Sequence, residues 1–180
     1  MNNLIYVGGI HAVGKSTIIK SLKVDCKVIS FSKNMANKLG ISVCSEDLND
    51  LPAITRENAR KQVFEDIVMN DNLLIMDSHY SIQNENGNSY PNNFEFGIPD
   101  FFVKKIDIFV LLQAPVKDIY ERRKEDGHRR RILDMDYIKL ELATERNFAD
   151  YSAIKANRKL HIIDNVNLCK SVKHLEEIIK

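Results

Sequence analysis

Compact apolar runs alternate with amphipathic segments along the whole chain. Each run is short enough for a buried strand, and several end at a glycine or a carboxylate. The predicted strands lie at residues 4–7, 28–31, 73–77, 106–112 and 160–163. Helical spacing between the runs predicts helices at residues 15–22, 32–39, 52–70, 116–124, 134–157 and 168–180. Because alternating strands and helices build parallel sheets covered on both faces, we expect an α/β fold with a five-stranded parallel sheet in a three-layer α-β-α arrangement.

The segment at residues 52–70 has a regular helical pattern. Ala59, Val63 and Ile67 recur every four residues and form one apolar face. The later segment at residues 78–99 is rich in Asn, Gly, Ser and Pro. It predicts a long loop that can hold a small hairpin, and loops of this length in compact domains are often functional.

Length and charge narrow the class of protein. The 180 residues fit a single domain over residues 1–180. The 26 basic and 25 acidic side chains nearly cancel, so no net field attracts nucleic acid or a membrane surface. No stretch approaches the ~20 apolar residues that span a bilayer. Three widely spaced cysteines form no disulfide framework, so we expect a cytoplasmic protein that binds neither membrane nor nucleic acid.

A complete phosphate-binding motif follows the first predicted strand. Its pattern is G-x-x-x-x-G-K-[ST], and it opens the first predicted helix, as phosphate binding requires. Backbone N–H groups of such a loop and the positive end of its helix bind negative charge. We expect Lys15 to reach the phosphates of ATP as a catalytic residue and Ser16 to ligate Mg²⁺. The predicted nucleotide-binding residues are Gly9, Ile10, His11, Ala12, Val13, Gly14, Lys15, Ser16 and Thr17.

Two candidate polar residues lie at and just after the end of the apolar strand at residues 73–77. Asp77 closes that strand, which predicts a carboxylate at the carboxyl edge of the sheet, where open α/β sheets bind ligands. We expect Asp77 to hold Mg²⁺ together with Ser16, directly or through water. His79 lies two residues further on and is a candidate contact for the acceptor or a phosphate, although an ordinary loop histidine fits the pattern equally well.

A basic segment at about residues 122–133 is a candidate lid. Arg122, Arg129 and Arg131 belong to a run of cations that follows the fourth strand and its helix. Arginines that close over the γ-phosphate stabilise the charge of the phosphoryl-transfer transition state, so these three are predicted catalytic residues. A solvated basic surface and an RNA-binding patch are the alternatives. The second lacks the interleaved aromatic residues on which bases stack.

These motifs together resemble the small, archaeal-type adenylate kinases. The resemblance covers most of the length. It rests on the phosphate-binding loop, the step Asp77-Ser78-His79, the loop from Gly87 to Pro99 with Tyr90 and Pro91, the helix end Arg122-x-x-x-Asp126, and the pair Arg129 and Arg131. The resemblance implies ATP and Mg²⁺ on the donor side, AMP as acceptor and commonly a homotrimer. It also implies that Asn165 lies in the loop that touches adenine and that Arg122, Arg129 and Arg131 are lid arginines.

The chain departs from this family at two places. His11 and Ala12 stand where the family usually has Pro and Gly, and alanine is less tolerant of a positive φ than glycine. Asn49 occupies the place of an arginine that holds the monophosphate. Arg56 and Arg60 are four residues apart on one helix face and can replace that arginine as substrate-binding residues. The alternative is that both are solvated, opposite the apolar face.

Three functions remain open at this point. The first is a nucleoside monophosphate kinase that uses ATP. The second is a kinase of another small metabolite, in which the substrate-side helix at residues 52–70 lines a different binding site. The third is a protein that binds or hydrolyses ATP and acts as a switch through a partner. The arginine run favours a kinase, whereas Asn49 favours the other two.

Overall fold

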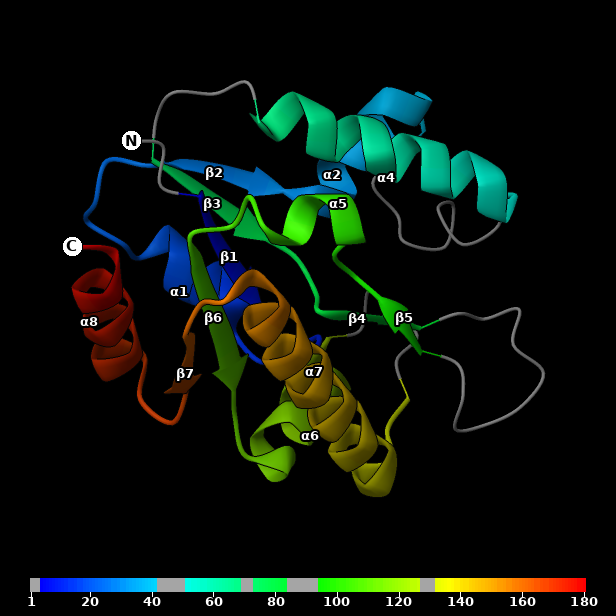
Figure 1. Cartoon of the computed structure of the whole chain (residues 1–180). Coiled ribbons are helices and arrows are strands. Elements are labelled where there is room, and N and C mark those ends of the chain that lie inside the picture. The colour runs from blue at the N-terminus through cyan, green and yellow to red at the C-terminus, as the bar shows by residue number, and fades with distance from the viewer. Residues whose placement is uncertain (1–3, 42–50, 69–72, 84–93, 127–131) are drawn as a thin grey trace.

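A five-stranded parallel sheet forms the centre of the molecule (Figure 1). The computed structural model describes residues 4–41, 51–68, 73–83, 94–126 and 132–180. The strands of the sheet, in the spatial order β2-β3-β1-β6-β7, are β1 (Leu4–Gly8), β2 (Lys27–Ser30), β3 (Leu74–Asp77), β6 (Ile108–Gln113) and β7 (Leu160–Asp164). All neighbouring pairs are parallel, which confirms the predicted sheet.

Helices connect the strands and cover both faces of the sheet. They are α1 (Lys15–Lys20), α2 (Phe31–Leu39), α4 (Ala53–Val68), α5 (Asp100–Val103), α6 (Val116–Glu125), α7 (Met135–Ala156) and α8 (Leu168–Ile179). A small antiparallel hairpin of β4 (Ser81–Gln83) and β5 (Phe94–Phe96) lies beside the sheet, as the loop composition predicted. Phe31 was predicted to end the second strand but begins α2, because its ring turns into the core against Phe64 at 4.8 Å between centroids.

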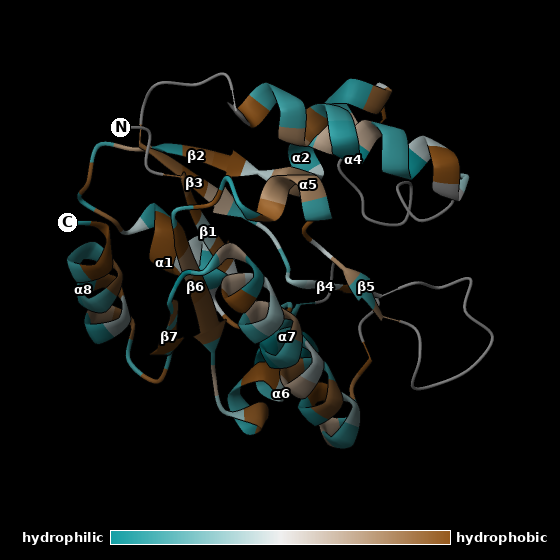
Figure 2. Cartoon of the chain, in the orientation of Figure 1, coloured by the Kyte–Doolittle hydropathy of each residue, from teal (hydrophilic) through white to brown (hydrophobic). Residues whose placement is uncertain are grey.

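The strand side chains alternate between two separate cores. Tyr6 of β1 belongs to a core under α2, α4, α5 and most of α7, whereas Ile5 and Val7 belong to a core under α1, α6 and α8. This alternation has the period of two that a pleated strand imposes. Figure 2 shows the resulting contrast between mostly hydrophobic central strands and helices of mixed character. The three-layer α-β-α arrangement is therefore confirmed.

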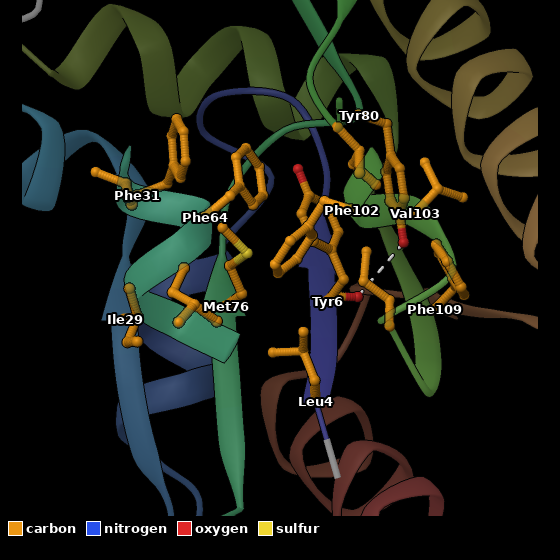
Figure 3. Packing of buried hydrophobic residues seen from close by; sticks show 14 of the residues in the cluster. Leu4, Tyr6, Ile29, Phe31, Phe64, Met76, Tyr80, Phe102, Val103 and Phe109 are labelled. Atoms are coloured by element: carbon orange, nitrogen blue, oxygen red, sulfur yellow. Dashed lines mark hydrogen bonds between the residues drawn. The ribbon is translucent and has the colours of Figure 1, made fainter. Parts of the chain in front are cut away.

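Aromatic rings fill the first of these cores near the carboxyl ends of β1 and β3 (Figure 3). Phe64 of α4 packs against Phe102 of α5 at 4.3 Å between ring centroids, and Tyr6 packs against Tyr80 at 4.9 Å. The hydroxyl of Tyr80 donates a hydrogen bond to the carbonyl of Val110, 3.1 Å away. These contacts hold the chain after β3 firmly against the sheet.

Helix α7 is anchored at both ends. The carboxylate of Asp134 accepts hydrogen bonds from the backbone N–H groups of Asp136 and Tyr137, which caps the first turn. Asn157 ends the helix in the left-handed conformation, with φ 55°. Across the described ranges, no helix has the length and apolar character needed to cross a membrane.

Candidate functional site

The predicted phosphate-binding loop joins the carboxyl end of β1 to α1. Gly14 has φ 100° and lies against the Asn165 amide, since a Cβ atom built on it would be 2.3 Å from Asn165 Nδ2. Ala12 has φ 66°, so an alanine adopts the left-handed conformation that glycine usually supplies. The loop therefore keeps its turn at Ala12 despite the departure from the family pattern.

Lys15 turns back over this loop. Its side chain is buried, and the ammonium donates hydrogen bonds to the carbonyl of Gly9 and to the carbonyl of Ile10 at 3.3 Å. The ammonium charge therefore lies next to the loop whose N–H groups bind phosphate. This placement agrees with the predicted role of Lys15, which stays a prediction.

Ser16 and Asp77 meet at the ends of α1 and β3. The Ser16 hydroxyl donates to Asp77 Oδ2 over 3.2 Å. Val7 and Asp77 are partners in the register of β1 and β3, so the carboxylate lies at the carboxyl edge of the sheet as predicted. A hydroxyl and a carboxylate are hard oxygen ligands of the kind Mg²⁺ takes, and both face the same point beside the loop. These two residues fit a magnesium ion.

Arg122 on α6 contacts the same loop from the other side. Its Nη1 donates hydrogen bonds to the carbonyls of Ala12 and Val13, both at 3.2 Å. The structure thus brings Arg122 to the phosphate-binding loop. Arg129 and Arg131 lie outside the described residues, and their predicted roles stay predictions. Thr17 is exposed in the first turns of α1, and its role is also untested.

The neighbouring Arg123 points into the protein. Its side chain is 2% exposed, and its Nη1 lies 2.7 Å from the carboxylate of Glu141 on α7. Its Nη2 also donates to the carbonyl of His11 at 3.4 Å. This structural role was not predicted. The available signal was that Arg123 shares a helix face with Ile119, which is fully buried.

Two histidines come together at this edge of the sheet. The rings of His11, in the loop, and His79, after β3, lie 4.4 Å apart between centroids at an angle of 57°. The Tyr6 hydroxyl donates to the carbonyl of His79 at 2.6 Å. His79 is therefore fixed beside the loop, and the pairing with His11 was not predicted.

Asn165 supports the loop from the end of β7. Its Nδ2 donates to the carbonyl of Val13 at 2.9 Å, and its backbone N–H donates to the carbonyl of Gln113 at 2.7 Å. The side chain is buried. This contact adds a structural role to the predicted adenine-side role, which stays a prediction.

The two arginines of α4 lie on its buried face. Arg56 and Arg60 share the face of Val63 and Ile67, which are buried in the core. The Nε atoms of both arginines are buried and have no hydrogen-bond partner among the described residues. One Nη of Arg60 lies 3.6 Å from Glu57, a long contact to an exposed carboxylate. The alternative of two solvated arginines opposite the apolar face is therefore wrong.

The charge of Arg60 acts on Tyr6 of β1. Burial raises the pKa of Tyr6 strongly, while the positive charge of Arg60 is among the interactions that lower it. Since the Tyr6 hydroxyl also contacts the His79 carbonyl, Arg60 lies in the neighbourhood of His79. The substrate-binding roles of Arg56, Arg60 and His79 stay predictions, and Asn49 lies outside the described residues.

A buried glutamate completes this region and was also missed. Glu145 of α7 is 1% exposed and accepts hydrogen bonds from the backbone N–H groups of Tyr80 at 2.8 Å and Ser81 at 2.7 Å. The hydroxyl of Ser81 donates to the same carboxylate. Burial raises the pKa of Glu145, and the hydrogen bonds from Ser81 and Tyr80 and the charge of Lys15 oppose that effect.

The fold and the loop geometry define a P-loop protein with the fold of the small-molecule kinases. The sequence profile of the AAA domain family matches residues 8–139, and the chain belongs to this family. The chain is also similar to an adenylate kinase from Pyrobaculum aerophilum, with 26% identity over 170 residues, or 89% of this chain and 83% of that protein. The resemblance to archaeal-type adenylate kinases is thereby confirmed.

Solved structures of small-molecule kinases share the fold. Shikimate kinase from Bacteroides thetaiotaomicron matches with a TM-score of 0.67 and 15% identity, over 98% of each chain. Shikimate kinase from Acinetobacter baumannii, solved with shikimate, matches with a TM-score of 0.62 and 17% identity over 99% of this chain and 94% of that one. A gluconokinase from Sinorhizobium meliloti matches with a TM-score of 0.53 and 13% identity over 98% and 91%.

Proposed function

We propose that this chain transfers the γ-phosphate of ATP to a small anionic acceptor, and that the acceptor is a nucleoside monophosphate, with AMP first. The buried, unpartnered Nε atoms of Arg56 and Arg60 carry this proposal. A buried polar atom without a partner is costly, so two such atoms on one face of α4 call for an anion from outside the described chain. The similarity to an adenylate kinase supports the same acceptor.

The donor side binds ATP through the loop and its neighbours. Backbone N–H groups of the loop hold the β-phosphate, and Lys15 leaves the loop carbonyls to contact the γ-phosphate. Ser16 and Asp77 would hold Mg²⁺, which would supply positive charge to the phosphates of ATP. Arg122 already contacts the loop carbonyls and needs little movement to reach a phosphate oxygen.

The acceptor side orients the attacking oxygen. Arg56 and Arg60 grip the phosphate of AMP, because guanidinium groups bind phosphate oxygens with charge-assisted hydrogen bonds. One phosphate oxygen of the acceptor then faces the γ-phosphorus in line with the leaving group. Lys15, Arg122 and the lid residues Arg129 and Arg131 stabilise the charge that spreads over the transferring group.

An acceptor screen tests this proposal. The purified protein is incubated with ATP and Mg²⁺ and with each of AMP, CMP, UMP, GMP and dTMP, and the diphosphates are measured. We expect ADP from AMP at a rate far above plain ATP hydrolysis. Lys15→Ala is the control and should abolish turnover. If no monophosphate is phosphorylated above the hydrolysis rate, the nucleotide kinase proposal fails.

A second candidate is a kinase whose acceptor carries a carboxylate. Guanidinium groups pair with carboxylate as readily as with phosphate, so Arg56 and Arg60 suit both. Shikimate kinase and gluconokinase act on such acids and share this fold, although their identity to this chain is low. Shikimate and gluconate therefore belong in the same screen, and phosphorylation of either in place of AMP would favour this candidate.

A further inference from the structure

Three elements fix the turn that carries His79. The Tyr6 hydroxyl of β1 binds the His79 carbonyl at 2.6 Å. Gly97, after β5, lies directly under that carbonyl, since a Cβ atom built on it would be 1.9 Å from the carbonyl oxygen. The backbone N–H of Gly97 also donates to the carbonyl of Tyr80 at 2.7 Å. The third element is α7, whose Glu145 accepts the bonds from Tyr80 and Ser81.

Helix α7 is linked to the backbone near both histidines, directly after His79 and through Arg123 of α6 at His11. Glu141 and Glu145 are four residues apart and lie on one face of the helix. Glu141 pairs with Arg123, which donates to the carbonyl of His11. Glu145 holds the two residues that follow His79. Helix α7 thus bonds to the residues after His79 and, through Arg123 of α6, to the carbonyl of His11.

We propose that Glu145 is a positioning residue, which holds the turn after β3 so that the imidazole of His79 meets that of His11 beside the phosphate-binding loop. The side chain reaches no substrate itself, because it is buried under the turn. It acts through His79, and this catalytic consequence rests on the function proposed above. A displacement of about 1 Å at a reacting group can lower a rate about 100-fold.

The hydrogen bonds from Tyr80 and Ser81 to Glu145 explain why a carboxylate is needed at this position. Glu145 Oε1 accepts from Tyr80, and Oε2 accepts from the N–H and the hydroxyl of Ser81. An amide at this position keeps the shape but replaces one oxygen by a donor, which faces an N–H group. The Glu145→Gln variant must therefore lose either the hydrogen bond from Tyr80 or the hydrogen bonds from Ser81.

The test measures the histidine pair directly and without any reaction. Wild type, Glu145→Gln and the milder Ser81→Ala are labelled on histidine, and the NMR cross-peak between the ring protons of His11 and His79 is recorded. We expect the cross-peak in wild type, a weaker one in Ser81→Ala and none in Glu145→Gln. Ala149→Gly is the matched control, because it weakens the same helix one turn further on and removes no hydrogen bond to the turn, and it should keep the cross-peak.

Kinetics provide the second measurement. We expect Glu145→Gln to lower kcat about 10- to 100-fold with KM for ATP changed by less than about threefold. In a His79→Ala background the same change should cause no further loss of kcat, because both act through one imidazole.

Two results would overturn the proposal: an unchanged cross-peak in folded Glu145→Gln, or an equal loss of kcat in both backgrounds. If wild type phosphorylates no acceptor, the proposed function fails, and the cross-peak alone decides whether Glu145 positions His79.

Discussion

Adjacent arginines on α6 offer a direct test of the structural reasoning. Arg122 lies on the phosphate-binding loop, whereas Arg123 is buried against Glu141 at 2.7 Å. We predict that Arg123→Ala destabilises the fold strongly, and that Arg122→Ala lowers turnover while the fold remains nearly as stable. The two changes remove the same side chain from consecutive positions, so each variant is the control for the other.

The expected magnitudes follow from the partners of each side chain. Arg123→Ala strands the Glu141 carboxylate, which is 14% exposed, and the loss of one partner from a buried ion pair costs about 3–5 kcal/mol. The pair itself contributes little net stability, because its desolvation offsets its attraction. Arg122 is only partly buried and leaves two backbone carbonyls that water can reach, so its loss costs about 1 kcal/mol.

Urea unfolding measures both values and can refute the reasoning. The double variant Arg123→Met with Glu141→Leu removes both charges and should recover most of the stability that Arg123→Ala loses. A loss below about 1 kcal/mol for Arg123→Ala would mean that the buried pair is not formed. A double variant as unstable as the sum of the single changes would mean that the loss comes from packing and not from a stranded charge.

Two further predictions concern the loop and the buried glutamate. Ala12→Gly should raise the unfolding free energy by about 0.5–1 kcal/mol in a urea titration, because the relief of about 1–2 kcal/mol of left-handed strain exceeds the added freedom of the unfolded chain. An unchanged or lower value would show that φ 66° is not strained at this position. The raised pKa of Glu145 means that the native state holds its proton to higher pH than the unfolded state. The stability that proton binding by Glu145 contributes is therefore fully present below the pKa of the unfolded state, and it is lost as the pH rises through the pKa of the folded state. As the pH rises from about 4, the unfolding free energy of wild type should fall relative to that of Glu145→Gln. A parallel pH dependence of the two proteins would contradict the prediction.

The elements of the fold were predictable because their signals are local. Each strand of the sheet is an apolar run of a few residues. The errors at strand ends are small: Phe31 belongs to α2, and the strand predicted at residues 106–112 is β6 (Ile108–Gln113). The placement of candidate site residues was predictable in two cases. The motif of the loop that ends at Ser16 is contiguous in sequence, and a strand end places Asp77 beside it. The spacing of apolar residues and the position of a residue along the chain are enough to predict both the strands and the location of these residues.

The buried polar contacts were not predictable, because they join residues that are far apart in sequence. Glu145 and the turn at Tyr80 are separated by 65 positions, and Arg123 and His11 by 112. Nothing in the pattern of a long helix shows that two of its glutamates face inward. A charged residue on an apolar face is the only sequence signal, and Arg123 beside Ile119 has it.

The polar atoms of the proposed donor and acceptor sides differ in whether they have hydrogen-bond partners. On the proposed donor side, Lys15 and Arg122 have carbonyl partners, and Ser16 has Asp77. The proposed acceptor side differs, because Arg56 and Arg60 each keep a buried Nε without a described partner. The Nε of Arg123 shares this feature, but Arg123 has a short ion pair, whereas the contact of Arg60 to Glu57 is 3.6 Å long. Since unpaired buried donors destabilise a fold, their retention on α4 is understandable where a ligand anion supplies the missing acceptor. The acceptor, more than the nucleotide, is therefore the ligand that should stabilise this protein when it binds.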